Sequence, residues 1–396
     1  MYTVLIMPVL NIVRVLRFYT ILLRCLGIIP IGYCQKENKY VLQTGWKFQL
    51  MHWNLQCIYT LSMAILITRR ESFFSTKNNY IENNYWNLLV FGAMLVQLLI
   101  NAWIFTLRRF HLHILNYCIH LTEELSGIAT RKVGLYQLVM MVAVMGASAL
   151  NTFFLWNRFS VPSTFRETCL HIPWLIFQIY FFILSFILSI YICIVQIIAG
   201  HLITLNTFIT MITFQRRLRI TDIYLDNIQN CLEIYDNILF ICTEYISKSY
   251  GVIFVLITFI STLDITFIVY GMYTGLMEGY LEKIYCIAQS VSFALPSVIF
   301  LCMMLLGSNI PGQANETVKI LAKIPHTGTG LDKMVDKFLM KNIRKKPILT
   351  AYGFFQLDRS ALFKLLTAII TYIMILVQFT DIENSLKTKQ IQTNKN

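Results

Sequence analysis

The sequence predicts an all-α membrane protein with seven transmembrane helices, a cytosolic N-terminus and an extracellular C-terminus. Three observations support this fold class. Hydrophobic residues make up 57% of the 396 residues and charged residues only 13%, whereas a soluble domain carries about a quarter charged residues. Seven apolar runs reach the roughly 20 residues that a helix needs to cross a bilayer. Lysine and arginine are concentrated in alternate connecting segments, which is the usual mark of the cytosolic side.

The N-terminal segment 1–27 is apolar but is interrupted by Arg14, Arg17 and Arg24. A cleaved signal peptide carries its charge ahead of the apolar run and a small-residue cleavage site behind it. Here the charge lies within and after the run. We therefore expect a cytosolic or interfacial helix in this segment, because no stretch of about 20 residues is free of charge.

The seven spans are predicted at about 46–68, 86–106, 133–156, 172–199, 251–273, 283–307 and 361–380. Tryptophan rings favour the membrane interface, and most tryptophans of the chain lie at or near the predicted span ends: Trp46, Trp86, Trp103, Trp156 and Trp174. The sequence shows no fixed-period repeat and no low-complexity tract. We therefore predict a single domain over residues 1–396.

Orientation follows from the distribution of basic residues. One set of connecting segments contains 23 lysines and arginines, and the opposite set contains eight. The rich set is the cytosolic one, and it comprises the N-terminus through Lys47 together with 107–132, 200–250 and 308–360. The net charge of +13 is thus a topology signal that suits anionic lipids of the inner leaflet, and no nucleic-acid partner is expected. A G-protein-coupled receptor would have the opposite orientation.

Two long cytosolic segments repeat apolar residues at helical spacing, one near 214–250 and one near 329–345. Amphipathic helices must cover their apolar faces, so we expect these two segments to pack together beneath the membrane. The apolar positions are Leu218, Leu225, Ile228, Leu232, Tyr235 and Leu239 in the first segment, and Leu331, Met334, Val335, Phe338, Leu339 and Ile343 in the second.

The last predicted span contains the stretch TYIMILVQF at residues 371–379. Gln378 follows Thr371 by seven positions and Phe379 follows Tyr372 by seven, which is close to two helical turns. These side chains and Ile375 therefore share a stripe of about a third of the helix circumference. A span that needs only lipid contact has no reason to carry this polar stripe.

The end of the chain, TAYGFFQLDRSALFKLLTAIITYIMILVQF at 350–379, resembles the C-terminal region of insect gustatory receptors. The hallmark of that family is Thr-Tyr, five apolar residues and Gln-Phe, and residues 371–379 match it without departure. The preceding GFF at 353–355 and LDRS at 357–360 also fit, and LRCLGIIPIG at 23–32 resembles a weaker signature at the other end. The chain departs from the family in a C-terminal tail of about sixteen residues after Phe379 and Thr380.

The resemblance implies a ligand-gated, non-selective cation channel built as a homo- or hetero-tetramer with other gustatory receptor subunits. In this family the last helix of each subunit lines the pore, here 361–380, and cytosolic helices form an anchor where subunits meet, here near 214–250 and 329–345. The candidate pore and gate residues are Thr371, Tyr372, Ile375, Gln378 and Phe379. The alternative for Gln378 is a hydrogen bond to a neighbouring helix, as polar residues in spans often make.

The resemblance also implies a ligand cavity in the outer half of the other helices. Asp264 lies near the middle of the fifth span, where an unpaired carboxylate costs about 2.5–3.5 kcal/mol or more. It would contact a cationic or hydroxylated ligand, or bond another helix, or mark a wrongly drawn span. The other candidate ligand contacts are polar or aromatic residues on spans three, four and six, a composition that suits small organic tastants such as alkaloids: Asn151, Trp156, Trp174, Gln178, Gln289 and Phe293.

No enzyme, cofactor or metal site is expected. The sequence has no glycine-rich phosphate loop, no HExxH and no GxSxG. Its ten cysteines show no CxxC pair, and His111, His113 and His120 lie at spacing unsuited to a metal. The resemblance instead implies a gustatory receptor subunit of the plasma membrane of gustatory neurons, including dendrite and axon, that detects a bitter or aversive compound. The alternatives are an odorant or internal chemosensory receptor of the same superfamily, or a secondary transporter using Asp264.

Overall fold

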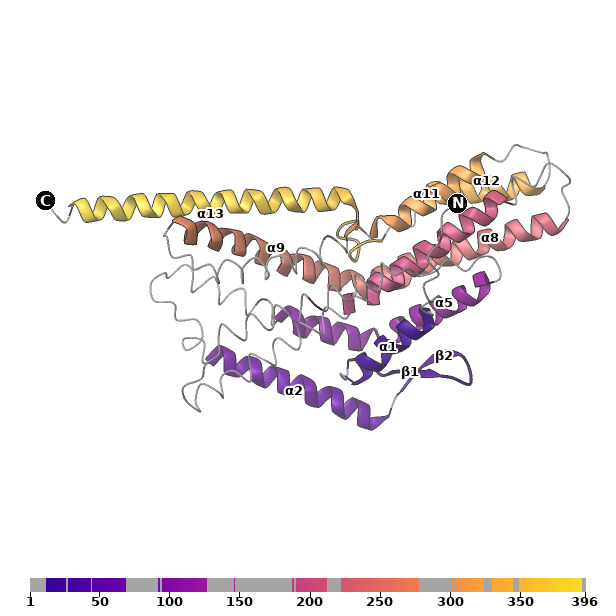
Figure 1. Cartoon of the computed structure of the whole chain (residues 1–396), viewed down its shortest axis with the longest axis horizontal. Helices are drawn as coiled ribbons and strands as arrows, with labels where there is room; N and C mark the ends of the chain where they lie inside the picture. Colours follow the sequence, from indigo (N-terminus) through magenta and orange to yellow (C-terminus); the bar gives the residue numbers. More distant parts are fainter. Residues whose placement is uncertain are drawn as a thin grey trace, which may run out of the picture.

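The protein is mostly helical, with one small β-hairpin near its N-terminus (Figure 1). The computed structural model describes residues 12–25, 28–43, 45–68, 92, 95–126, 146, 187–188, 190–211, 222–277, 301, 304–305, 307–323, 330–344 and 349–393. Its elements are α1 (Ile12–Cys25), β1 (Ile31–Cys34), β2 (Lys39–Leu42), α2 (Trp46–Thr68), α5 (Arg108–Ser126), α8 (Asp222–Phe240), the π-helix η1 (Ile241–Ile246), α9 (Ser247–Met277), α11 (Asn309–Ala322), α12 (Gly330–Arg344) and α13 (Arg359–Thr393). Two further helices run over Leu95–Thr106 and Ile190–Met211.

Three of the described helices are long and apolar enough to cross a membrane: Ile190–Met211, Asp226–Leu263 and Arg359–Ile382. They overlap the predicted spans at 172–199, 251–273 and 361–380. The predicted span at 46–68 coincides with α2 in its bounds. The predicted span at 133–156, except for residue 146, and most of the span at 283–307 lie outside the described residues. The count of seven spans and the direction of the termini therefore stay predictions.

The long helix of the fifth span differs from its sequence-based description. The amphipathic segment 214–250 and the span 251–273 were expected as separate units. The structure instead runs α8, η1 and α9 end to end, from Asp222 to Met277. No proline interrupts this stretch, and the wide turn of a π-helix absorbs one extra residue without ending the helix.

The hairpin is a small departure from the all-α prediction. Strands β1 and β2 pair antiparallel, with Tyr33 opposite Tyr40, and Asn38 takes the left-handed conformation in the turn (φ 48°), which asparagine tolerates better than most residues. The side chain of Asn116 on α5 bonds both main-chain groups of Tyr40: its Oδ1 accepts from the amide (2.7 Å) and its Nδ2 donates to the carbonyl (3.0 Å). The Asn116 side chain thus bonds the main chain of β2 as a neighbouring strand would, and it holds the hairpin against α5.

The two predicted amphipathic segments form α8 and α12, and the two helices contact each other. The ring of Tyr235 on α8 meets the ring of Phe338 on α12 edge to face, with centroids 5.0 Å apart. Both side chains are buried. Lys341 Nζ lies 2.6 Å from Asp236 Oδ2 at the rim of this contact. The apolar faces that the sequence predicted therefore meet at this ring contact, and α12 also packs against α11.

Helix α11 is tied to the Ile190–Met211 helix by buried polar groups. Asn206 Nδ2 donates to the carbonyl of Gln313 (3.0 Å), and Thr317 Oγ1 donates to Asn206 Oδ1 (2.6 Å). Thr317 and Asn206 are both buried. The described core thus gathers α8, η1, α9, α11 and the Ile190–Met211 helix into one packed body.

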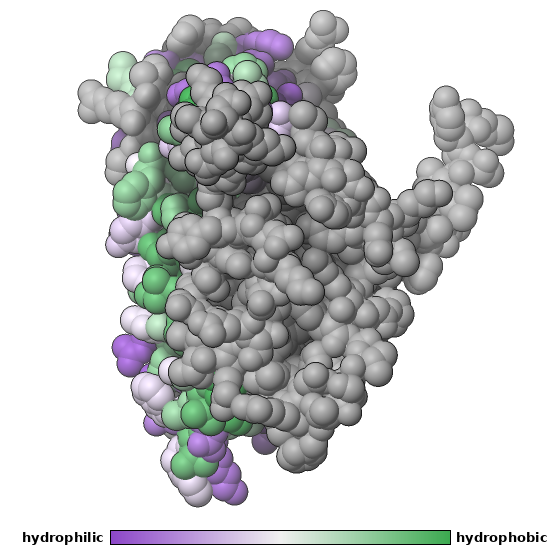
Figure 2. Space-filling model, turned by 90° about the vertical axis from the view of Figure 1, so that its left-hand side faces the viewer, coloured by the Kyte–Doolittle hydropathy of each residue, from purple (hydrophilic) through white to green (hydrophobic). Residues whose placement is uncertain are grey.

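Helix α13 lies beside α9 at the edge of the molecule and extends past the end of α9 (Figure 1). In the space-filling view, hydrophobic residues lie down the left side of the molecule, interspersed with hydrophilic ones (Figure 2). Many large apolar side chains are exposed, including Phe363, Ile370 and Phe379 of α13. Such a surface belongs in contact with lipid or with other protein rather than water.

Candidate pore helix and candidate binding cavities

Helix α13 uses one face to contact α9. Ile369 is 4% exposed, and the hydroxyls of Tyr270 on α9 and Thr380 on α13 lie 2.7 Å apart in a hydrogen bond. Ile369 and Thr380 are eleven positions apart, which is close to three helical turns, so they share one face. This face fixes α13 within the subunit.

All five candidate pore residues are exposed on α13. Thr371 lies nine positions before Thr380, about two and a half turns, and therefore on the side opposite α9. The same helical spacing, counted back from Thr380, places Gln378 and Ile375 close to Thr371 on the side opposite α9. Tyr372 and Phe379, with 59% and 67% of their surface exposed, flank this strip.

The exposed strip is polar for a helix of such high hydropathy. The hydroxyls of Thr367 and Thr371 donate to main-chain carbonyls one turn earlier, at 3.0 and 2.9 Å, so each leaves its oxygen available as an acceptor. Gln378 is exposed seven positions beyond Thr371. A strip of hydroxyl and amide oxygens beside apolar rings is what a water-filled cation path with a dewetting constriction needs.

The candidate ligand contacts fall mostly outside the part of the chain that the structure describes. Asp264 lies within α9, after the buried Ser261 and before the buried Ile265. Six other candidates lie outside the described residues: Asn151, Trp156, Trp174, Gln178, Gln289 and Phe293. The ligand cavity predicted in the outer half of the helices is therefore still a prediction.

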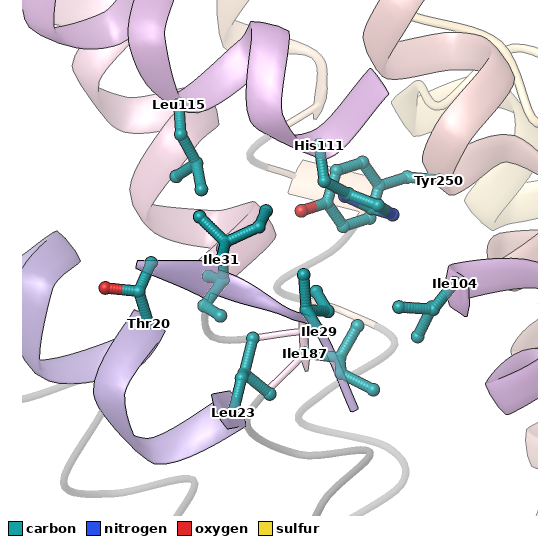
Figure 3. Close-up of a pocket in the computed structure, with 10 residues that line it drawn as sticks. Thr20, Leu23, Ile29, Ile31, Ile104, His111, Leu115, Ile187 and Tyr250 are labelled. Atoms are coloured by element: carbon teal, nitrogen blue, oxygen red, sulfur yellow. The ribbon is translucent and has the colours of Figure 1, made fainter. Parts of the chain in front are cut away.

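One enclosed cavity lies where α1, β1, α5 and the start of α9 meet (Figure 3). Its volume of about 20 Å³ accommodates one water molecule and no larger ligand. His111 and Tyr250 lie together at one side of it, with ring centroids 5.1 Å apart at a steep angle. His111 Nε2 has no hydrogen-bond partner among the described residues, and burial lowers the pKa of His111 to about 4. This site holds a neutral histidine, and it suits a buried water better than a tastant.

A second, open cavity of about 610 Å³ lies between the hairpin turn, α5 and the α8–η1 junction, which is within the usual volume range of small-molecule sites. Its polar lining includes Glu37, His113, His120 and Glu123. This cavity was not predicted from the sequence. One pattern in the sequence could have pointed to it: the spacing of His113, Asn116, His120 and Glu123 places these four polar residues on one face of α5.

Among the residues that the structure describes, no three histidine, cysteine, aspartate or glutamate side chains are grouped to hold a metal ion. His111, His113 and His120 all lie on α5, a helix within the segment 107–132 that the sequence analysis treated as a connection between spans. His111 is buried while His113 and His120 are exposed. The three side chains therefore lie in different environments.

Known proteins similar to this chain were found by sequence and by structure. A family model described as a 7tm chemosensory receptor matches residues 16–383. The chain is 32% identical to gustatory and pheromone receptor 39a, isoform C, of Drosophila melanogaster, over 93% of this chain and 96% of that protein. Isoform B of the same receptor is 28% identical over 95% of this chain and 98% of that protein.

Among solved structures, the olfactory receptor OR5 of Machilis hrabei in complex with eugenol matches with a TM-score of 0.70. The match covers 92% of this chain and 98% of that receptor at 12% sequence identity. A second structure of the same receptor matches with a TM-score of 0.69. At such low identity the likeness shows a shared fold.

Proposed function

The chain belongs to the insect gustatory receptors of the 7tm chemosensory receptor family, and on this basis we propose that it is a subunit of a ligand-gated, non-selective cation channel. The observation that supports the proposal is that α13 is highly apolar but almost uncovered within its own chain. Its most apolar stretch has a mean hydropathy of 2.1 but is only 6% buried in the single chain. A helix with so little cover inside its own subunit needs partners outside it.

The proposed assembly is a tetramer, of this chain alone or with other gustatory receptor subunits, in which α13 of each subunit faces a central pore. Thr371 and Gln378 provide oxygens for hydrated cations, and Ile375 and Phe379 narrow and dewet the closed gate. Tyr372 lies beside the gate. The contact between α8 and α12 belongs to the cytosolic anchor that holds the subunits together.

The proposed ligand is a small bitter or aversive tastant, bound in the outer half of the helices by Asp264 and the six aromatic and polar candidates on spans three, four and six. The receptor acts at the plasma membrane of gustatory neurons, including dendrite and axon, with membrane lipid around its apolar faces. Two of the relatives are named gustatory and pheromone receptors, which favours a pheromone as the second candidate ligand. An odorant or internal-sensing role in the same superfamily stays an alternative.

The test is whole-cell current from cells that express this chain, challenged with quinine, caffeine, denatonium, sucrose and fructose. Gln378→Ala is compared with Gln229→Ala, the same chemical change on the exposed surface of α8. A ligand-evoked cation current whose reversal potential or rectification changes in Gln378→Ala, but not in Gln229→Ala, supports the proposed pore. Equal currents in all three chains argue against the assignment of Gln378. Substrate uptake without channel-like current would favour a transporter using Asp264.

A further inference from the structure

The segment just before α13 is a compact, hydrogen-bonded loop. We call residues 349–358 the linker loop. Two main-chain hydrogen bonds close it, from the amide of Ala351 to the carbonyl of Phe355 and from the amide of Leu357 to the carbonyl of Leu349, both at 2.9 Å. Leu349, Ala351 and Leu357 are at most 2% exposed. The loop therefore has a fixed shape that these three buried residues anchor in the core.

The linker loop also determines where α13 begins. Tyr352 and Gly353 take the left-handed conformation, with φ of 52° and 84°, a backbone shape that costs a bulky residue such as tyrosine on the order of 1 kcal/mol or more. Asp358 Oδ1 then accepts a hydrogen bond from the amide of Ala361 (2.7 Å), which is the usual cap of a helix start. The strained turn and the cap together set the position of the first turn of α13.

Two glycines on different helices make room for the linker loop. A Cβ atom at Gly251 of α9 would lie 2.3 Å from the main-chain nitrogen of Tyr352. A Cβ atom at Gly307, just before α11, would lie 2.9 Å from Cβ of Leu357 and 3.0 Å from its carbonyl oxygen. Gly200 and Gly312 lie on neighbouring helices with nothing within 4 Å of such an atom. Only the first pair of glycines is needed for a close approach.

A hydroxyl group connects the linker loop to the π-helix. Ser247 Oγ donates to the carbonyl of Cys242 (2.9 Å), and the amide of Thr350 donates to Ser247 Oγ (3.2 Å). The amide of Ser247 also donates to the same Cys242 carbonyl, five residues earlier, which is the bond of a π turn. The loop is thus bonded to Ser247, the residue that directly follows η1 and begins α9. A change of η1 from π to α geometry would break this arrangement.

A third helix completes the seat of the loop. The indole nitrogen of Trp103, on the Leu95–Thr106 helix, donates to the carbonyl of Ser249 (3.1 Å). Its ring also meets the ring of Tyr352 edge to face, with centroids 6.0 Å apart. The base of α13 is therefore held by α9, by the start of α11 and by the Leu95–Thr106 helix at once.

We propose that the linker loop is a rigid joint that transmits movement of α9, η1 and α11 to the pore helix α13, and that Gly251, Gly307 and Ser247 are positioning residues for channel opening. The proposal rests on the channel function proposed above. None of these residues belongs to the candidate pore residues of α13. They act by fixing where α13 starts relative to the rest of the subunit, so their effect is on the balance between closed and open channels rather than on ion selectivity.

The decisive variants are Gly251→Ala and Gly307→Ala, with Gly200→Ala and Gly312→Ala as matched controls. Alanine is the better helix former by about 0.5–1 kcal/mol, so the control substitutions leave folding intact. The first measurement is sodium current without any added compound, divided by the number of chains at the cell surface. We expect at least a threefold change for Gly251→Ala and Gly307→Ala, no change for the two controls, and an unaltered reversal potential throughout.

The second measurement is hydrogen exchange of the amides of residues 349–358 in the purified full chain. We expect exchange at least tenfold faster in Gly251→Ala than in Gly312→Ala, because the displaced loop loses its main-chain hydrogen bonds.

If Gly251→Ala does not reach the cell surface, Ser247→Ala replaces it in the current measurement, since this variant removes a single oxygen. A change in current per surface chain for Ser247→Ala supports the joint, and an unchanged current contradicts it.

The two proposals fail in different ways. Equal currents in Gly251→Ala, Gly307→Ala and the controls, with wild-type current present, overturn the joint and leave the channel intact. No current in any chain at confirmed surface expression counts against the channel. In that case the exchange measurement still tests whether Gly251 fixes the linker loop in place, and equal exchange in Gly251→Ala and Gly312→Ala rejects that role.

Discussion

The helix that runs from α8 into α9 and the helix α13 are both long and apolar but differ in what covers them. Their most apolar stretches have mean hydropathies of 1.7 and 2.1, yet 61% of the first is buried within the chain and only 6% of the second. The Ile190–Met211 helix, at 67% buried, resembles the first. Apolarity alone therefore does not tell whether a helix packs inside its own subunit.

The difference teaches which helix is built for partners outside the chain. Lipid tails are as apolar as leucine, so an apolar face gains little by leaving lipid for another helix. A polar strip such as Thr371 and Gln378 is different, because it needs water or polar partners. The proposed pore would give the exposed strip of α13 both water and neighbouring subunits, and the four predictions that follow compare buried with exposed positions.

The largest effect is expected where the two regions differ most in burial. Phe338 of α12 is 5% exposed and packs on Tyr235, whereas Phe363 of α13 is 72% exposed. Phe338→Ala should lower the free energy of unfolding by about 3–5 kcal/mol, and Phe363→Ala by less than about 0.5 kcal/mol. Thermal unfolding of the solubilised chain compares the two. Equal losses would mean that α13 is as well packed in the subunit as α12.

The second effect depends on pH and on His111. Burial lowers the pKa of His111 to about 4 in the folded chain, while an unfolded histidine titrates near 6.5. The unfolded chain therefore binds the proton first as pH falls, and His111 destabilises the fold progressively from about pH 6.5 down to about pH 4. The full loss is roughly 3 kcal/mol.

The variant His111→Phe should reduce this pH dependence, and unfolding temperatures measured between pH 7.5 and 5 would show it. His113→Phe, at an exposed position of the same helix, is the control. A wild-type stability that does not fall between pH 6.5 and 5 would contradict a neutral, buried His111.

The third effect concerns the buried polar contact of the packed region. Asn206→Ala removes the amide that donates to the Gln313 carbonyl and the oxygen that accepts from the Thr317 hydroxyl, and leaves these two buried groups only the longer hydrogen bond to each other (3.2 Å). A loss of about 1–3 kcal/mol in the free energy of unfolding is expected. Thr207→Ala, at the exposed neighbouring position, should change little. Denaturant unfolding distinguishes them, and a neutral Asn206→Ala would show that α11 is not held by this contact.

The smallest effect is expected from the ion pair at the rim of α8 and α12. Lys341 and Asp236 are 50% and 36% exposed, and exposed pairs contribute about 0–1 kcal/mol. Lys341→Met should therefore lower stability by less than about 1 kcal/mol, and 0.5 M salt should abolish the difference. A loss as large as that of Phe338→Ala would mean that charge rather than ring packing holds the two helices together.

The sequence predicted those parts of the fold whose signal is local. Helical spacing identified the segment that forms α12, and its contact with α8 followed from apolar faces that need cover. The exposed stripe of α13 was predicted from the same periodicity. The family was identified from nine residues, 371–379, together with the number, direction and spacing of the apolar runs.

Other features depend on contacts between distant residues and left no local signal. The hairpin is held by Asn116, 76 positions from Tyr40. The π-helix arises within a stretch that reads as ordinary helix. Gly251 and Gly307 look like unremarkable helix glycines until Tyr352 and Leu357 are placed against them.

The most direct test of the central claim is disulfide formation between subunits in native membranes. Helix α13 contains no cysteine, so Phe379→Cys on its exposed side and Ile369→Cys on its α9-facing side can be compared with the wild-type chain under mild oxidation. The pore model predicts covalent dimers for Phe379→Cys, and none beyond the wild-type level for Ile369→Cys. Dimers from Ile369→Cys alone, or from neither variant, would contradict the placement of α13 at a shared central pore.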